Sequence, residues 1–263
     1  MADLRLLNRF DYVLAESFRQ TIRDCAGEIW EANGVVSWAS SLKQASPAHA
    51  NGVMRMNRLM SAREVMGITA GFFRARGHGY TVLVRSDDRA LTGEIKRSGW
   101  GLEAEHVALV LTGPLAVPTS TKGVDRRRVK NPSGMLDFCA TITAAMGSGQ
   151  DVQRFVNLGL RRIQALLAPS KAAFLAYDEG TAAACALGSV IDGVVFIGWV
   201  GTKPEHRRRG LGTSVTEAAV QAGFDQGASL AAALSPLTAV PFLATLGFEE
   251  VGRYREYVFP PPN

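Results

Sequence analysis

The sequence has little of what disulfide frameworks, metal centres and membrane spans require. It holds three cysteines and four histidines in 263 residues, and Cys25, Cys139 and Cys185 are too few and too widely spaced for a disulfide framework or a metal site. No histidine has a carboxylate or cysteine at ligand spacing, and His206 is expected to be a solvated loop residue. No apolar run approaches the roughly 20 residues that cross a bilayer, and no secretory segment opens the chain. We therefore predict a cytoplasmic protein with no metal and no membrane contact.

Acidic residues are in the minority, and the chain carries a formal net charge of +5 with a pI of about 9.3. A basic chain raises the question of nucleic acid binding. The arginine clusters at 126–128, 161–162 and 207–209 are not interleaved with aromatic residues and match no DNA-binding pattern. Nucleic acid is therefore the weakest partner we consider. At 47% hydrophobic and 20% charged, the chain can fill one large or two modest cores.

An apolar strand pattern at 194–200 leads through an arginine- and glycine-rich turn into an amphipathic helix that begins near Thr213. The first amides of a helix lack intrahelical acceptors, and the helix dipole places partial positive charge there, so anions bind at such ends. Gly210 and Gly212 leave the backbone open to phosphate oxygens, while the arginines at 207–209 add donors and charge. The turn is predicted to bind a pyrophosphate.

Three further elements follow this helix in order. An apolar run at 228–234 predicts a buried strand, and 237–246 predicts a helix. Gly247 is placed to end that helix, with Phe248 as the hydrophobic residue beside it. The alternating residues of 251–259 predict a final strand.

The spacing Arg207-x-x-Gly210-x-Gly212, within this order of elements, resembles the second half of a domain of the GNAT acetyltransferase superfamily, and the resemblance covers 194–259. It implies an α/β fold with a mixed sheet flanked by helices, and acetyl-coenzyme A (acetyl-CoA) as the co-substrate. It also implies that an amine attacks the thioester directly in a ternary complex, with no covalent enzyme intermediate.

The chain also matches itself at a shift of 148 residues, which carries Gly99-Trp100 onto Gly247-Phe248 and 80–85 onto 228–233. The helical pattern at 65–73 then falls on the helix after the arginine turn. Coincidence within a common strand-helix-strand pattern is the alternative. The repeat predicts two GNAT-like modules, each a mostly antiparallel mixed sheet flanked by helices.

We place the N-terminal module at 1–112, a linker rich in Pro, Gly, Ser and Thr at 113–123, and the acetyl-CoA-binding module at 124–263. The further elements expected in the C-terminal module are a strand at 125–130, helices at 134–146 and 150–167, and strands at 171–178 and 181–190.

The two modules differ at the phosphate turn. The same shift puts Ala62 on Gly210 and Glu64 on Gly212, which adds side chains and a negative charge where the pyrophosphate would lie. The N-terminal module is therefore predicted to be a degenerate copy that does not bind coenzyme A.

The resemblance implies which residues contact the cofactor. The end of the strand at Val200 to Thr202 should splay from its neighbour and offer main-chain groups to the pantetheine arm. Ser235 either reaches the pantetheine or caps the next helix. The expected cofactor-binding residues are Val200, Gly201, Thr202, Arg207, Arg208, Arg209, Gly210, Leu211, Gly212, Thr213 and Ser235.

No catalytic residue is assigned. The family commonly has a tyrosine acid four residues before the glycine of Leu-Gly-Phe, and that position here is Leu243. Tyr254 and Tyr257 are conceivable substitutes but are expected to pack in the core. Asp192 and Glu205 flank the strand in turns, where we expect them to be solvated. An amine that arrives neutral, or that loses its proton through water, needs no side-chain base.

These observations predict an acetyl-CoA-dependent N-acetyltransferase that acts on a small-molecule or protein amine. Pocket residues come from variable loops, so the acceptor is not specified, and a homo-oligomer remains open. The alternative is a non-catalytic acyl-CoA-binding regulatory protein, because an intact cofactor turn stands beside an absent tyrosine.

Overall fold

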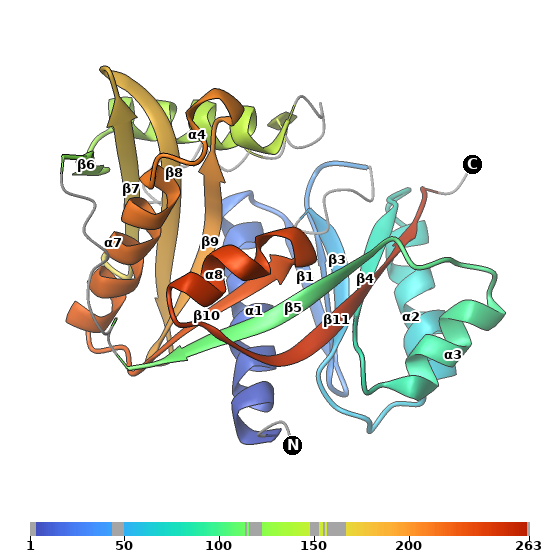
Figure 1. Ribbon diagram of the computed structural model, residues 1–263. Helices are drawn as coiled ribbons and strands as arrows, with labels where there is room; N and C mark the ends of the chain where they lie inside the picture. The colour runs from blue at the N-terminus through green and yellow to red at the C-terminus, as the bar shows by residue number, and fades with distance from the viewer. Residues whose placement is uncertain are drawn as a thin grey trace. The chain divides into compact units, whose positions relative to one another are not determined.

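The computed structural model describes residues 4–43, 50–113, 115, 123–147, 153–154, 156 and 167–261, and it contains both helices and strands in each half of the chain (Figure 1). Contacts divide the chain into two units. The first unit comprises Met1–Ala108, Ser235–Leu237 and Val251–Asn263, and the second comprises Leu109–Leu234 and Thr238–Glu250. Neither unit is continuous in sequence. The predicted boundary at 113–123 lies mostly outside the described residues.

The first unit has a mixed sheet with the strand order β1-β2-β3-β4-β11, in which β3 and β4 are parallel and the other pairs are antiparallel. Its elements are α1 (Leu4–Asp24), β1 (Glu28–Ala32), β2 (Val35–Ala39), β3 (Asn51–Arg55), α2 (Ala62–Arg74), β4 (Tyr80–Arg85), α3 (Arg89–Arg97), the first part of β5 (Ala104–Thr112) and most of β11 (Glu249–Phe259). The strand predicted at 80–85 is confirmed as β4.

Helices cover both faces of this sheet. Alternate side chains of a strand point to opposite faces, so β2 offers apolar side chains to the helices on each side. In β2, Val35 and Ala39 belong to the core under α2 and α3, together with Val65 of α2. Trp38, on the other face of β2, stacks on Phe18 of α1 with ring centroids 4.4 Å apart.

The strand β11 completes the first unit. It pairs antiparallel with β4, from Tyr254 opposite Arg85 to Phe259 opposite Tyr80. The rings of Tyr80 and Phe259 stack 4.7 Å apart. A strand from the end of the chain therefore closes the core of the N-terminal half.

A buried polar cluster ties α1 to this strand pair. The Tyr254 hydroxyl donates a hydrogen bond to Asp11, and Arg85 donates to the other oxygen of the same carboxylate at 2.8 Å. Asp11 is only 4% exposed. Burial raises the pKa of Asp11 above its ordinary value of 3.8, although the hydrogen bonds from Tyr254 and Arg85 oppose that shift.

The substitution Asp11→Asn should therefore change how stability depends on pH. The folded chain holds the Asp11 proton more tightly than the unfolded chain, so this contribution is fully present below pH 3.8 and is lost as pH rises through the folded pKa. The free energy of unfolding of the wild type minus that of Asp11→Asn should fall as pH rises, by about 1.4 kcal/mol per unit of pKa elevation. Urea titrations at several pH values measure this difference. A difference that grew with pH would mean that the pairing with Arg85 outweighs burial.

The second unit has the strand order β10-β9-β8-β7-β6, in which β9 and β10 are parallel and the other pairs are antiparallel. Its elements are β6 (Asp125–Arg128), α4 (Pro132–Met146), β7 (Lys171–Asp178), β8 (Thr181–Ile191), β9 (Val194–Thr202), η1 (Pro204–His206), α7 (Leu211–Asp225), most of β10 (Leu230–Pro236), most of η2 (Leu237–Ala239) and α8 (Val240–Thr245).

Most elements predicted within residues 124–263 are confirmed within small shifts of their ends. They are the strands at 125–130, 171–178, 181–190, 194–200, 228–234 and 251–259, and the helices at 134–146 and 237–246. The helix predicted at 150–167 lies almost wholly outside the described residues. Both units carry a mixed sheet flanked by helices, which confirms the predicted fold class.

The sheet of the second unit also has a helix on each face (Figure 1). On one face Phe138 and Ile142 of α4 pack with Leu175 and Cys185. On the other face α7 lies so close that a Cβ on Gly223 would come 2.3 Å from the Cβ of Val195. This tight seating fixes the helix whose N-terminus follows the arginine turn.

The predicted glycine end of α8 is confirmed. Gly247 has a φ of 87°, and its amide donates to the Ala244 carbonyl at 3.0 Å. The Phe248 amide reaches back to the Leu243 carbonyl at 3.2 Å. This is the Schellman pattern, in which a left-handed glycine lets two amides bond the last carbonyls of the helix.

The end of α3 repeats the pattern at the predicted shift. Gly99 has a φ of 84°, its amide donates to Lys96 at 3.0 Å, and the Trp100 amide donates to Ile95 at 3.4 Å. The match at a shift of 148 residues therefore includes the hydrogen bonds that end the two helices, as well as the residue types. The two halves of the chain therefore share a structural repeat.

Candidate functional site

The site begins where β9 ends. Cys185 of β8 is opposite Gly201 and Leu187 is opposite Gly198, so β9 has one extra residue between these pairs. Trp199, within that bulge, has a φ of 52°, which is rare for a bulky residue. Bulges bend a strand and re-aim the residues after it. The bulge therefore sets the direction of the last residues of β9, Val200 to Thr202.

The parallel partner of β9 does not accompany it to this end. Pairing with β10 covers Val194 to Phe196 opposite Leu230 to Ala232 and extends no further, although both strands are described beyond it. On that side, the main-chain groups of Val200 to Thr202 are outside the parallel ladder. Such groups are donors and acceptors for an extended ligand.

Ser235 lies on β10 and is assigned to the other compact unit. Its side chain is 2% exposed, and its hydroxyl donates to the Pro236 carbonyl at 3.1 Å. A cap must accept a hydrogen bond from a helix amide, and no described amide donates to this hydroxyl. The alternative of a helix cap is therefore wrong.

The arginine turn ends at Gly210, which is the N-cap residue of α7 and has a φ of 75°. Its carbonyl accepts the Ser214 amide at 3.0 Å, but no side chain caps the helix. The amides of Leu211 to Thr213 have no acceptor in the described part of the chain. Three neighbouring donors at the positive end of a helix dipole are thus available to an anion.

Gly212 faces the end of β9. A Cβ on Gly212 would lie 2.8 Å from the Thr202 hydroxyl oxygen, so any side chain here would force Thr202 to move. The turn and the strand end are consequently held close together at this point.

The three arginines of the turn have different surroundings. Arg207 donates to the carbonyls of Thr202 at 3.1 Å and Ala145 at 3.3 Å. Arg209 donates to Asp178 at 2.5 Å. Arg208 is exposed, has a φ of 65°, and makes no hydrogen bond or ion pair with any described residue.

His206 is not the solvated loop residue that the sequence suggested. Its Nδ1 lies 2.7 Å from Asp178 Oδ2, the oxygen that also receives Arg209, and its side chain is 19% exposed. The His206 ring, followed by Arg209, holds the pKa of Asp178 below its usual value. The prediction was wrong because Asp178, at the end of β7, is distant from His206 in sequence and close to it only in the fold.

The position of the usual acid offers no proton. Leu243 lies on α8 and is 5% exposed. Tyr254 and Tyr257 are 1% and 0% exposed in the core of the first unit, where they pack as expected. Burial and the nearby Asp11 raise the pKa of Tyr254 well above its ordinary value. Neither phenol is accessible to a substrate.

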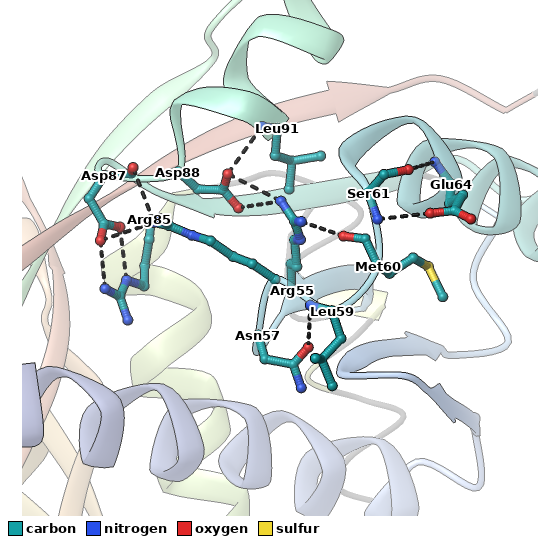
Figure 2. A network of polar contacts seen from close by, with 11 residues as sticks. Arg55, Asn57, Leu59, Met60, Ser61, Glu64, Arg85, Asp87, Asp88 and Leu91 are labelled. Carbon is teal, nitrogen blue, oxygen red and sulfur yellow. Dashed lines mark hydrogen bonds and ion pairs between the residues drawn. The ribbon is translucent and has the colours of Figure 1, made fainter.

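The counterpart turn of the first unit is closed by its own side chains (Figure 2). Ser61 is the N-cap of α2, its hydroxyl accepts the Glu64 amide at 3.3 Å, and its amide donates to the Glu64 carboxylate at 2.9 Å. This capping box satisfies the amides of Ser61 and Glu64 and places a carboxylate at the helix end. The caps align Ser61 with Gly210, so the counterpart of Gly212 is Arg63 and the predicted alignment was wrong by one residue.

A buried ion pair also stabilises the turn before α2. Arg55 donates to both oxygens of Asp88 at 3.2 and 3.0 Å and to the Met60 carbonyl (Figure 2). Asp88 also accepts the Leu91 amide at 3.1 Å as the N-cap of α3. Contacts within the chain therefore fix this turn and put a carboxylate at the helix end, whereas the N-terminus of α7 has no side-chain cap.

The described residues contain no group of three or more His, Cys, Asp or Glu side chains that could hold a metal ion. Among the described helices, none is both long enough and apolar enough to span a membrane. The cluster at 126–128 is used within the second unit, since Arg126 donates to the Ser214 carbonyl at 3.1 Å and Arg127 to Asp125 at 2.9 Å.

Comparison with solved structures shows the same fold in other proteins. A GCN5-related N-acetyltransferase from Kribbella flavida has a TM-score of 0.70 at 19% identity, covering 95% of this chain and 96% of that one. One from Sphaerobacter thermophilus has a TM-score of 0.66 at 13% identity, covering 88% and 78%. A tandem GNAT protein from the clavulanic acid biosynthesis pathway has a TM-score of 0.59 at 13% identity, covering 87% and 79%.

No curated protein matches the chain in sequence. A family model does match, and it spans β7 to α8, which include the bulged strand, the arginine turn and the uncapped helix. Residues 146–248 match the model of the acetyltransferase (GNAT) family, so the chain carries a GNAT-family domain on a fold that it shares with a tandem GNAT protein.

Proposed function

We propose that the protein is an acetyl-CoA-dependent N-acetyltransferase whose C-terminal module, residues 124–263, holds the cofactor. The observation that carries this proposal is the uncapped N-terminus of α7, where the amides of Leu211 to Thr213 have no acceptor among the described residues. Donors of this kind fit a pyrophosphate. Three further observations support the same ligand: the glycine at 210, the match to the family, and Arg208, which has no partner in the part of the chain that the structure describes.

In this proposal the chain binds and orients, and coenzyme A carries the acetyl group as a thioester. The turn from Arg207 to Thr213 holds the pyrophosphate, chiefly through main-chain amides. The end of β9, Val200 to Thr202, offers main-chain groups to the pantetheine arm, outside its ladder with β10. Ser235 is a further candidate for that arm, although its hydroxyl is already engaged by Pro236. Fixing the cofactor in this way lowers the entropy cost of bringing an amine to the acetyl carbon.

No side chain is proposed as a general acid or base. Leu243 cannot donate a proton, and Val194 to Val200 carries no carboxylate. An amine that reaches the site neutral, or that passes its proton to water, needs no such group, and a thiol is a good leaving group near neutral pH. We propose an amine of a small molecule or a protein as the acceptor, in the cytoplasm.

The N-terminal module, residues 1–112, is proposed to have lost cofactor binding. Its counterpart turn is occupied by the capping box of Ser61 and Glu64. The hydrogen bonds with Ser61 hold the pKa of Glu64 below its ordinary value, so the carboxylate is charged where a phosphate would lie. Residues 113–123 then link a binding module to a non-binding one.

The buried Leu243 at the usual acid position favours one alternative, a regulatory protein that binds acyl-CoA without turnover. Two measurements on the full chain separate the two functions. Calorimetry with acetyl-CoA tests binding, and thiol release across a panel of amines tests transfer. We expect binding together with acceptor-dependent thiol release. Tight binding with no release from any amine would favour the regulatory protein, and no binding would reject both.

A further inference from the structure

The arginine turn contains more positive charge than it exposes to a ligand. The Arg207 guanidinium donates hydrogen bonds to the carbonyls of Thr202 and Ala145, at 3.1 and 3.3 Å. These bonds join the turn to the end of β9 and to α4. An arginine committed to two main-chain acceptors stabilises the turn and has fewer donors left for a phosphate.

Asp178 commits the charge of a second arginine. Its Oδ2 receives Arg209 at 2.5 Å and lies 2.7 Å from His206 Nδ1, so one carboxylate oxygen holds two side chains of the turn. Asp178 is the last residue of β7, beside a tight hairpin in which Glu179 and Gly180 have φ values of 49° and 79°. A carboxylate on a fixed strand end thus neutralises Arg209.

Arg208 is exposed like its neighbours but differs from them in its partners and its backbone. Its side chain is exposed and has no partner among the described residues, and its φ of 65° is unusual for a residue with a side chain. Backbone strain of this kind is concentrated at functional sites. It also stands two residues before the N-cap of α7, next to the free amides.

We infer that Arg208 is the one arginine of the turn that binds a phosphate of coenzyme A, and that Asp178 is a positioning residue that withholds Arg209 from that phosphate. This inference rests on the proposed function and deepens it. Arg207 and Arg209 already hold the turn through their contacts with the protein. Less of the turn therefore has to become ordered when the ligand binds.

Calorimetry with coenzyme A on the full-length variants tests the inference, at two salt concentrations. Arg208→Gln should bind about tenfold more weakly than the wild type and with a shallower salt dependence, because it loses a charge-assisted bond. The matched control is the double variant Asp178→Asn with Arg209→Gln. It removes one charge of each sign, keeps the net charge of the turn, and should bind within about threefold of the wild type.

Asp178→Asn alone separates positioning from general structural support. It frees Arg209 while the new amide oxygen still offers an acceptor to His206, so coenzyme A should bind at least as tightly as in the wild type, with a steeper salt dependence. A structural residue of no electrostatic consequence would not steepen it. Melting curves check that each variant is folded; Arg208 and Arg209 are exposed on the turn, and Asp178 is partly exposed at the end of β7.

The outcomes are distinct. Equal affinities for Arg208→Gln and the wild type would overturn the role of Arg208. A double variant as weak as Arg208→Gln would show that Arg209 binds the phosphate, and a tenfold loss in Asp178→Asn would show that Asp178 does not withhold it. A wild type that binds no coenzyme A would instead reject the proposed function itself.

Discussion

Replacing Asp88 with alanine should lower the free energy of unfolding of the first unit by about 3–5 kcal/mol, because it leaves a buried arginine without its counter-ion. Arg55 and Asp88 have side chains only 5% and 9% exposed and approach to 3.0 Å. Arg55 Nε already has no hydrogen-bond partner among the described residues. The substitution also removes the N-cap of α3 at the Leu91 amide, which contributes about 1 kcal/mol of that loss.

The neighbouring carboxylate is the control. Asp87 pairs with Arg85 and Arg58, but its side chain is 46% exposed, so Asp87→Ala should cost no more than about 1 kcal/mol. Asp88→Asn keeps an acceptor for the cap and isolates the charge. Urea unfolding followed by tryptophan fluorescence mainly reports the first unit, which holds Trp30, Trp38 and Trp100. If Asp88→Ala and Asp87→Ala lost similar stability, the burial argument would fail.

Gly212→Glu should weaken the binding of coenzyme A by at least about 100-fold, equivalent to roughly 2.7 kcal/mol. A glutamate would bring a negative charge to the free amides of α7, where we propose that the pyrophosphate lies. It would also press on the Thr202 hydroxyl, which a Cβ at 212 approaches to 2.8 Å. Calorimetry measures the affinity, and circular dichroism checks that the fold survives the local strain.

Two variants divide this effect into its parts. Gly212→Ala introduces the contact with Thr202 without the charge, and should cost about tenfold or less. Glu64→Gln changes the equivalent helix end of the first unit and should leave the affinity for coenzyme A unchanged, since that end is closed by Ser61. Loss of affinity in Glu64→Gln would place the cofactor at the N-terminal copy. An unchanged affinity in Gly212→Glu would remove the pyrophosphate from α7.

Features with a local signal were predictable from the sequence. Gly247 and Gly99 each end a helix by the same short-range hydrogen bonds, so a shift that matched them also matched whole elements. The turn at 207–213 was identifiable because its glycines and arginines stand between a strand pattern and a helix pattern. Helix ends were less exact, because the shift put Ala62 on Gly210, whereas the hydrogen bond from the Glu64 amide makes Ser61 the N-cap of α2.

Features that depend on residues far apart in sequence were not predictable. Nothing in the sequence near 178 indicates that this carboxylate contacts His206 and Arg209. The contact forms only because the fold brings the end of β7 close to the arginine turn that follows β9. The alternation of 251–259 predicted a strand but could not choose its partner. The pairing with β4 depends on Tyr254 and Phe259 matching surfaces in the other half of the chain.

The pairing of β11 with β4 has a consequence for how the protein is made. On the ribosome, α1 to α3 emerge long before β11, the strand that lies beside β4. The hydrogen-bonding edge of β4 therefore stays unpaired until β11 is synthesised. An unpaired edge of this kind invites wrong partners. The nascent N-terminal half therefore depends on a segment translated late, and a chain truncated before residue 251 would have an open sheet edge at β4.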